Sequence, residues 1–251
     1  LKELVDYGRT KNVGVCIWYN SGGHHTWSRM VGPIDMMLDR DIRRKEMKKI
    51  SEIGIAGLKV DFFGGDKQDR MQQYLGILED ALDYKLMINY HGCTIPRGWE
   101  RKYPNLMTME AVRGAEAYPK GHPEDRYGGP TAIHSVRITM TRNVVGSMDF
   151  TPVMFNGRCV TPHPESQDYS FTLATAITFE SALTHYPDYA DKDRHGYRMI
   201  YAAYPEVGTL LREIPTTWDE SRLLSADMDS HCFWARRKGD EWYLGGLNGK
   251  P

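Results

Sequence analysis

Short apolar runs alternate with longer amphipathic segments along the first half of the chain. The runs at residues 13–19, 55–63 and 85–90 have the length and composition of strands buried on both faces. Between them, apolar positions recur every three or four residues over 38–53 and 71–82, which predicts helices with one buried side. A strand, a helix and a further strand form a βαβ unit, so the strands are expected to be parallel.

The same alternation continues beyond residue 100. Residues 106–110 and 144–148 are expected to be further short strands, and residues 130–142 and 167–183 are expected to be helices. Repeated strand–helix units favour an α/β fold, a (β/α)8 barrel of the TIM type, over a sandwich. About five or six strands can be recognised, so we expect the barrel to be incomplete at its N-terminus.

The C-terminal end has a different pattern. Residues 232–236 and 241–245 flank a Lys-Gly-Asp turn at 238–240, which predicts a β-hairpin. We therefore expect a barrel over residues 1–215 and the truncated beginning of a C-terminal β-sandwich domain over residues 216–251.

Composition excludes several classes of partner. The chain has 251 residues, a net charge of −1 and no basic stripe, so no nucleic acid is expected to bind. No apolar run approaches the roughly 18 residues of a membrane span, and none is expected. A start without Met, inside an apparent helix, suggests a fragment. The widely spaced cysteines predict small buried side chains and no zinc or redox motif: Cys16, Cys93, Cys159 and Cys232.

Polar side chains stand where the predicted strands end. The carboxyl ends of parallel barrel strands face the active site, so these side chains are expected to gather at one mouth. Acids, a lysine, an asparagine and a histidine at one place predict a binding or catalytic site. From the first strand to the last, these residues are Trp18, Asn20, Lys59, Asp61, Asn89, His91, Glu110 and Asp149.

Two pairs of charged residues are the sharpest candidates. Lys59 and Asp61 are two apart on one strand and therefore point to the same face, where they form either a structural ion pair or part of a site. Glu110 and Glu116 flank Gly114, which permits a turn. Cleavage of a glycosidic bond needs two carboxyl groups, and a hard divalent cation also prefers such oxygens. The alternative is that Glu116 is a solvated loop residue.

Two adjacent histidines suggest a metal at first sight. His24 and His25 would point in opposite directions on a strand, and no HxH or HExxH pattern accompanies them. We expect loop histidines that line a cleft, with a zinc-dependent hydrolase as the alternative.

Four motifs, in their order along the chain, resemble glycoside hydrolase family 97. They occupy residues 57–66, 88–92, 103–106 and 109–116, and the segment from Trp218 resembles that family's passage into its C-terminal β domain. The resemblance implies a catalytic (β/α)8 barrel that cleaves α-glycosidic bonds and binds Ca²⁺. It also implies an N-terminal β-sandwich domain, missing here, that completes the site, so this chain alone could be inactive.

The residue after His91 decides between the two branches of that family. Inverting members carry a glutamate base there, whereas this chain has Gly92. The resemblance therefore implies the retaining, α-galactosidase-like branch, with Asp61 as the nucleophile and Glu116 as the general acid/base. A retaining enzyme holds these two carboxyl groups about 5–5.5 Å apart, so we expect the short separation here.

The remaining roles follow from the same resemblance and from the strand ends. Glu110 and Glu116 are expected to bind calcium. The substrate is expected to be an oligosaccharide with a terminal α-linked hexose. The alternatives are α-glucosidase-like specificity and a barrel that binds carbohydrate without cleaving it. The family suggests a periplasmic, secreted or cell-surface protein. Expected substrate contacts are Lys59, His91, Asn89, Trp18 and Asn20.

Overall fold

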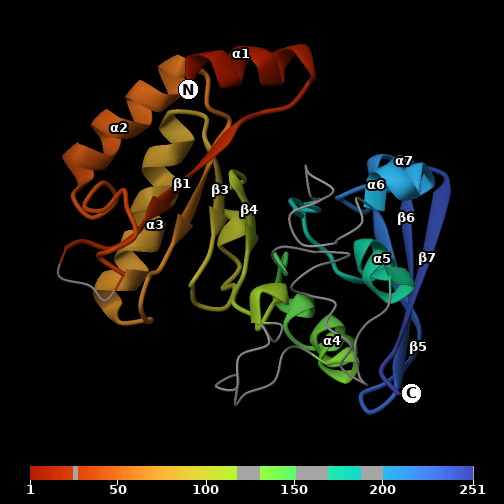
Figure 1. Ribbon diagram of the computed structural model, residues 1–251. Helices are drawn as coiled ribbons and strands as arrows, with labels where there is room; N and C mark the ends of the chain where they lie inside the picture. Colours follow the sequence, from red (N-terminus) through yellow and green to blue (C-terminus); the bar gives the residue numbers. More distant parts are fainter. Residues whose placement is uncertain (25–27, 118–130, 151–168, 188–199, 251) are drawn as a thin grey trace. The chain divides into compact units, whose positions relative to one another are not determined.

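The computed structural model falls into two compact units, Leu1–Ala111 and Val112–Pro251, and each is described by itself (Figure 1). None of the helices in the described segments is both long and apolar enough to cross a bilayer. The structure describes residues 1–24, 28–117, 131–150, 169–187 and 200–250.

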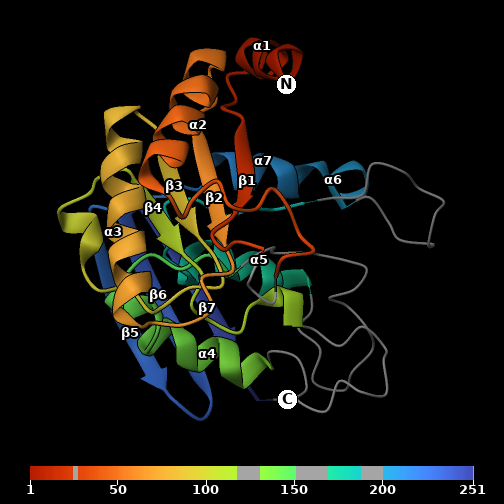
Figure 2. The ribbon, with the colours of Figure 1, turned by 90° about the vertical axis from the view of Figure 1, so that its left-hand side faces the viewer.

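The N-terminal unit is built on a four-stranded parallel sheet, β1-β2-β3-β4. Helices α2 (Arg40–Ile53) and α3 (Gln68–Asp83) lie side by side along this sheet (Figure 2). Helix α1 (Lys2–Thr10) precedes the first strand, and the 3-10 helix η1 (Trp99–Arg101) precedes the last. The strands are β1 (Cys16–Asn20), β2 (Gly57–Asp61), β3 (Met87–Tyr90) and β4 (Leu106–Met109).

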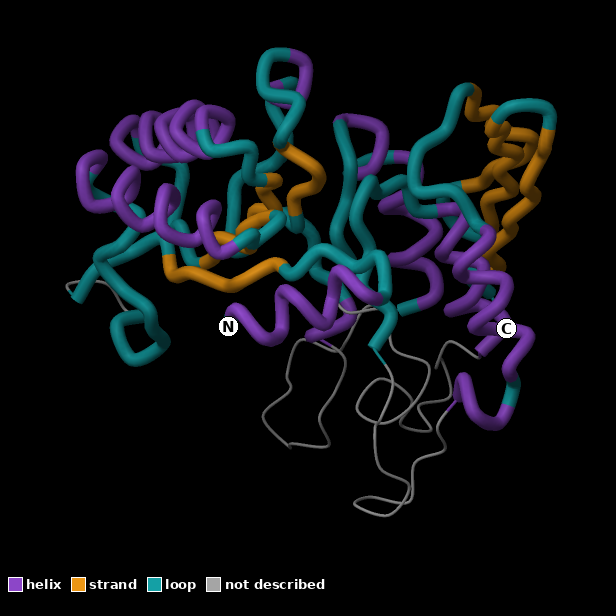
Figure 3. Tube along the Cα trace, turned by 90° about the horizontal axis from the view of Figure 1, so that it is seen from above, coloured by secondary structure: helices purple, strands orange, loops and turns teal. Residues whose placement is uncertain are grey.

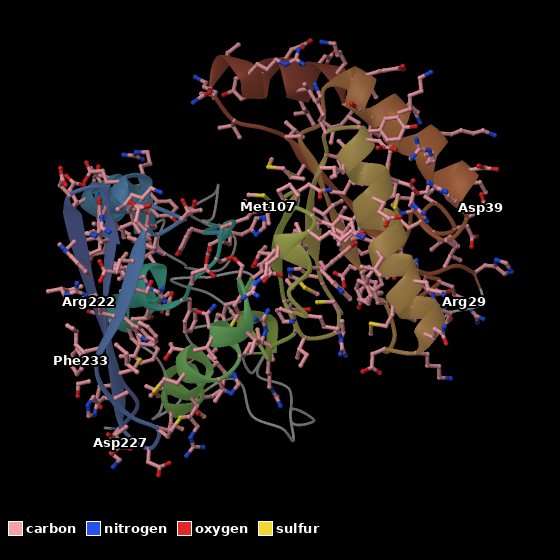
Figure 4. The ribbon with its side chains drawn as sticks, turned by 180° about the vertical axis from the view of Figure 1, so that it is seen from behind. Arg29, Asp39, Met107, Arg222, Asp227 and Phe233 are labelled. Atoms are coloured by element: carbon pink, nitrogen blue, oxygen red, sulfur yellow. The ribbon has the colours of Figure 1, made fainter. Side chains whose placement is uncertain are left out.

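Local sequence sets both ends of α2. The Asp39 side chain, labelled in Figure 4, accepts hydrogen bonds from the backbone N–H groups of Asp41 and Ile42. An aspartate in this position satisfies donors that have no partner inside the helix. At the other end Gly54 adopts a left-handed φ of 98°, which stops the helix before β2 begins.

Alternation along the strands separates an apolar face from a polar one. Val60 of β2 and Tyr90 of β3 are 0% exposed and belong to the core that the helices cover. Tyr74 of α3 stacks on Phe63 with 3.8 Å between ring centroids. Burial of each such side chain contributes about 1.5–3 kcal/mol. The intervening residues, such as Lys59, point to the other face of the sheet.

A buried carboxylate joins α2 to α3. The Asp80 side chain is 1% exposed and accepts hydrogen bonds from Arg43 Nε (2.9 Å), Arg44 Nη1 (2.7 Å) and Arg40 Nε (3.3 Å). Burial alone would raise the pKa of Asp80, but the hydrogen bonds from Arg44 and Arg43 outweigh it and hold that pKa below its ordinary value. The charge is therefore compensated where it is buried.

The C-terminal unit contains a three-stranded antiparallel sheet, β5-β6-β7, and several helices (Figure 3). Helices α4 and α5 pack on one face of the sheet and share a core with it. The elements are η2 (Ala115–Ala117), α4 (Ala132–Met140), η3 (Asn143–Val145), α5 (Tyr169–Thr178), α6 (Ile200–Ala203), α7 (Pro205–Glu213), β5 (Glu220–Asp227), β6 (His231–Lys238) and β7 (Glu241–Asn248).

Arg236 of β6 fastens α5 to this sheet. Its guanidinium group is buried and donates to the carbonyl oxygens of Ile177 (2.6 Å) and Thr178 (3.0 Å), and to Ser221 Oγ (2.8 Å). Carbonyl groups in the last turn of a helix lack partners within the helix, so the cation satisfies them. Burial lowers the pKa of Arg236. The opposite face of the sheet carries the exposed Phe233 (Figure 4).

The α/β class and the C-terminal β segment are confirmed. The described residues do not show a closed barrel, which stays a prediction. The strand expected at 144–148 is wrong, because these residues begin with the 3-10 helix η3 and Met148 makes only an isolated bridge. Val144 and Val145 are exposed, and the Asn143 side chain holds the turn through the backbone of Glu180.

The helices expected at 130–142 and 167–183 are present as α4 and α5 and end earlier than expected, at Met140 and Thr178. Helices α6 and α7 and strand β5 were not predicted. In α7 the spacing of Val207, Leu210 and Leu211 is helical and was overlooked, whereas polar and apolar positions do not alternate regularly in β5. Strands β6 and β7 pack on α4 and α5 within one unit, and β5 pairs with β6. The boundary between residues 215 and 216 stays a prediction.

Replacing the buried carboxylate should destabilise the N-terminal unit. We expect Asp80→Ala to lower the free energy of unfolding by about 3–5 kcal/mol, because it leaves the buried Arg43 unpaired. Since the folded pKa of Asp80 is lowered, its contribution is present at neutral pH and is lost as the pH falls below about 3.9. Denaturant titration at several pH values measures both. Asp83→Ala is the control, because this residue is exposed and pairs with Arg44. The free energy of unfolding of this variant should stay close to that of the wild type.

Candidate active site

Strand register brings the predicted residues into one row on the polar face of the sheet. Trp18 of β1 is paired with Lys59 of β2, Lys59 with Asn89 of β3, and Asn89 with Thr108 of β4. In register, parallel neighbours point to the same side, so these side chains form a continuous row. Asp61, two residues beyond Lys59, lies on this face at the carboxyl end of the sheet.

Asp61 is half-buried and both of its oxygens accept a hydrogen bond. The indole Nε1 of Trp18 donates to Oδ2 at 3.2 Å, and the backbone N–H of Phe62 donates to Oδ1 at 2.7 Å. The rings of Trp18 and Phe62 meet edge to face with 5.6 Å between centroids. The carboxylate is thus held in one orientation beside two aromatic side chains.

The backbone after β2 is unusual at Phe62. Its φ of 66° is in the left-handed region, which a residue with a side chain rarely adopts. This conformation turns its N–H back onto Asp61. Such backbone states cluster at functional sites. The sequence predictions overlooked Phe62, and the only signal was its place before Phe63, Gly64 and Gly65.

Glu110 bridges the ends of β3 and β4. Its Oε2 accepts a hydrogen bond from the backbone N–H of Gly92 (2.8 Å) and lies 3.6 Å from Nδ1 of His91. The His91 side chain is 2% exposed, whereas that of Glu110 is 19% exposed. His91 therefore supports a carboxylate that reaches the surface.

Lys59 and Asn89 lie in the row behind Asp61. Asn89 is buried and Lys59 is half-buried. The hydrogen bonds that orient the Asp61 carboxylate come from an indole and a backbone amide, so its geometry does not depend on an ion pair with Lys59. The substrate contacts of Lys59, Asn89 and His91 stay predictions.

Asn20 anchors a loop. Its side chain is 0% exposed, and Nδ2 donates to the carbonyl oxygens of Ser28 (3.0 Å) and Val31 (2.8 Å). Its Oδ1 accepts from the backbone N–H of Gly22 at 2.8 Å and from the Ser28 hydroxyl at 3.2 Å. These bonds occupy the amide fully, so the geometry favours a role in shaping the loop after β1.

Glu116 lies in the second unit, in the 3-10 helix η2, and its side chain is outside the described residues. Its separation from Asp61 and its role as acid/base stay predictions. In the same unit, the buried Asp149 has Oδ2 3.6 Å from Nδ1 of His185. Asp149 was expected at the end of a strand. In the structure it follows only the isolated bridge at Met148.

The metal predictions also stay open. Across the described ranges, no group of three or more His, Cys, Asp or Glu side chains is arranged to hold a metal. Glu110 offers hard oxygens of the kind that calcium prefers, and its expected partner Glu116 is the side chain not described. His24 is exposed, with Nδ1 3.4 Å from Oδ2 of Asp35, and His25 lies outside the described residues.

Two family models match the chain. The model described as "Glycoside hydrolase 97" matches residues 1–112, and the model described as "Glycosyl-hydrolase 97 C-terminal, oligomerisation" matches residues 217–251. The chain belongs to glycoside hydrolase family 97. The resemblance drawn from the four sequence motifs is therefore confirmed.

Curated proteins of similar sequence carry α-galactosidase names. A "Probable retaining alpha-galactosidase" of Streptomyces bingchenggensis (strain BCW-1) is 30% identical over 246 residues, which cover 98% of this chain and 33% of that protein. A "Retaining alpha-galactosidase" of Bacteroides thetaiotaomicron is 33% identical over 254 residues, covering 98% and 34%. This chain spans about a third of the length of these relatives.

Solved structures agree with the family 97 assignment. A crystal structure of a β-arabinopyranosidase superposes with a TM-score of 0.79 at 33% identity, covering 99% of this chain and 38% of that one. A family 97 enzyme of Pseudoalteromonas sp. strain K8 in complex with acarbose has a TM-score of 0.74 at 21% identity, covering 98% and 38%. The second likeness shows a shared fold.

Removing the Asn20 side chain should loosen the loop that follows β1. We expect Asn20→Ala to lower the free energy of unfolding by about 2–3 kcal/mol, since it leaves several buried groups without partners. Ser28→Ala, which removes one hydroxyl from the same cluster, should cost about 1 kcal/mol. Denaturant titration compares the two. An Asn20→Ala protein of wild-type stability with a raised KM would instead make Asn20 a substrate contact.

Proposed function

We propose that this chain carries the nucleophile and the acid/base of a retaining α-glycoside hydrolase, most specifically an α-galactosidase. The observation that supports this is the environment of Asp61. The carboxylate stands at the carboxyl end of β2 on the polar face of the sheet, half-buried, with one donor on each oxygen. Its position at a strand end is where catalytic residues of α/β barrels occur.

The proposed reaction is a double displacement. Glu116 donates a proton to the glycosidic oxygen while an Asp61 oxygen attacks the anomeric carbon, so the bond to the leaving group breaks as the glycosyl–Asp61 ester forms. Glu116 then removes a proton from water, which attacks the same carbon and releases Asp61. The indole of Trp18 and the N–H of Phe62 keep the carboxylate aimed in both steps. Lys59, His91 and Asn89 are proposed to hold the sugar hydroxyls.

Calcium is proposed as the cofactor, bound by Glu110 and Glu116. When bound, the ion would supply positive charge beside the acid/base and fix its orientation. Two residues of this chain would orient Glu110 for the ion. The N–H of Gly92 donates to its Oε2, and His91 lies against the same oxygen.

The proposed substrate is an oligosaccharide with a terminal α-linked hexose. Two relatives are named for α-galactosidase activity, which supports galactose over glucose. One structural neighbour is named for β-arabinopyranosides. In the L series that sugar has the ring-hydroxyl arrangement of α-D-galactose without the exocyclic hydroxymethyl group, so it is the second candidate. α-Glucosidase-like specificity and binding without cleavage remain alternatives.

The wider setting is also a proposal. The strands described here are proposed to belong to a (β/α)8 barrel whose active site is completed by an N-terminal β-sandwich domain. The protein is proposed to act in the periplasm or outside the cell. Comparing aryl α-galactoside, α-glucoside and β-L-arabinopyranoside as substrates of the full-length protein separates the specificities, and turnover of none of them would favour a binding role.

Removing the nucleophile should abolish turnover in a way that azide repairs. We expect Asp61→Gly to lower kcat on an aryl α-galactoside by about 10⁴-fold or more. Azide should restore part of the rate and yield a β-galactosyl azide, because a small anion then attacks from the vacated side. Asp66→Ala is the control: this exposed acid, which pairs with Arg97, should leave kcat unchanged. An Asp61→Gly enzyme with wild-type kcat would exclude Asp61 as the nucleophile.

The configuration of the first product tests the double displacement itself. Two inversions at the anomeric carbon give net retention, so we expect α-galactose to appear before β-galactose. Proton NMR during the first minutes of hydrolysis, before the sugar mutarotates, distinguishes the two anomers. Early appearance of the β anomer would mean a single displacement by water and would remove the nucleophilic role of Asp61.

A further inference from the structure

Gly92 lies where the ends of β2 and β3 meet. The N–H of His91 donates to the carbonyl oxygen of Val60 at 2.9 Å, and the N–H of Phe63 donates to the carbonyl oxygen of Gly92 at 3.1 Å. The segments at the ends of β2 and β3 are therefore hydrogen-bonded to one another on both sides of Asp61. Gly92 itself has a left-handed φ of 49°.

A side chain at residue 92 would occupy space that Asp61 already fills. An ideal Cβ built on Gly92 would lie 2.8 Å from the Phe62 nitrogen, 2.9 Å from Asp61 Oδ1 and 3.0 Å from the Phe62 Cα. Contacts this short force one of the partners to move. Two of the three atoms belong to the backbone, which cannot rotate out of the way as the tip of a flexible side chain can.

The Phe62 nitrogen and Asp61 Oδ1 are the two ends of one hydrogen bond, 2.7 Å long. A Cβ at residue 92 would therefore press on the bond that orients the carboxylate. On its other side, the N–H of Gly92 donates to Oε2 of Glu110 at 2.8 Å. Residue 92 thus lies beside both acids that are given a role in this unit: a Cβ added to it would meet Asp61, and its amide binds Glu110.

We propose that Gly92 is a positioning residue, and that its lack of a side chain is what allows Asp61 to hold the attacking orientation. On this backbone, a carboxylate nucleophile at residue 61 and any side chain at residue 92 exclude one another. The inference rests on the proposed nucleophilic role of Asp61. It also means that adding a carboxylate at residue 92 displaces the nucleophile and does not simply supply a second base.

The first experiment compares two glycines of the full-length protein that both have positive φ. Gly92→Ala should lower kcat on an aryl α-galactoside by about a hundredfold, the loss typical of a reacting group misplaced by about 1 Å, with a smaller change in KM. Gly98 has a φ of 76°, and a Cβ added there would have no atom within 4 Å. Gly98→Ala carries the same backbone strain without the contact, so its kcat should match wild type while its Tm falls by about 2–4 °C.

The second experiment asks whether the effect runs through the Asp61 carboxylate. In an Asp61→Gly background with azide, the added Gly92→Ala change should lower the rescued rate by less than about fivefold, because the group it disturbs is absent. Gly92→Ala should also lower the Tm less in that background than in wild type. The Tm comparison needs no activity and decides the matter even where Gly92→Ala alone folds poorly.

Two outcomes would overturn the proposal. One is a Gly92→Ala enzyme with wild-type kcat. The other is an equal loss of rate and of Tm in both backgrounds, which would make Gly92 a structural residue only. Failure of azide to rescue Asp61→Gly at all would instead count against the proposed function. In that case the Tm coupling between residues 61 and 92 still tests the steric exclusion by itself.

Discussion

The in-register parallel pairing of β1 to β3 decides which side chains meet in the N-terminal unit. Because residues alternate across each strand, one register places Val60 and Tyr90 in the core and Trp18, Lys59 and Asn89 in a row on the opposite face. A slip of one residue would send Lys59 into the core if it occurred in β2, and Asn89 if it occurred in β3. Burial of the apolar face therefore fixes the geometry of the polar one, and the scaffold and the site are stabilised by the same constraint.

The carboxylates of Asp80 and Asp61 differ in how many hydrogen-bond donors they receive. Asp80 is buried, and both of its oxygens accept hydrogen bonds from arginine side chains, so this carboxylate has no capacity left for a ligand. Arg236 is buried as well and donates to two carbonyl oxygens and a hydroxyl. Asp61 is half-buried and is oriented by one indole and one amide. A carboxylate that is oriented but not saturated can form a further bond, which is what a nucleophile requires.

The backbone beyond the strand ends adds a second constraint. Phe62 and Gly92 both have positive φ. Their backbone segments approach so closely that a single methyl group at residue 92 would not fit. Glu110 accepts from the amide of that same residue. The orientation of Asp61 and that of Glu110 therefore depend on one glycine, and the strain at Phe62 is held in place by the hydrogen bonds that flank it.

The sequence by itself determined the four parallel strands, the helices between them and the residues at their ends, because hydrophobic periodicity and helix caps are local properties. Its motifs also determined the family. Only the tertiary structure decided that the Asn20 side chain is hydrogen-bonded within a loop and that Trp18 donates to Asp61. It also decided that a side chain at residue 92 would not fit. It also replaced the strand expected at 144–148 by a turn held from Glu180. These features depend on contacts between residues far apart along the chain, which no local pattern records.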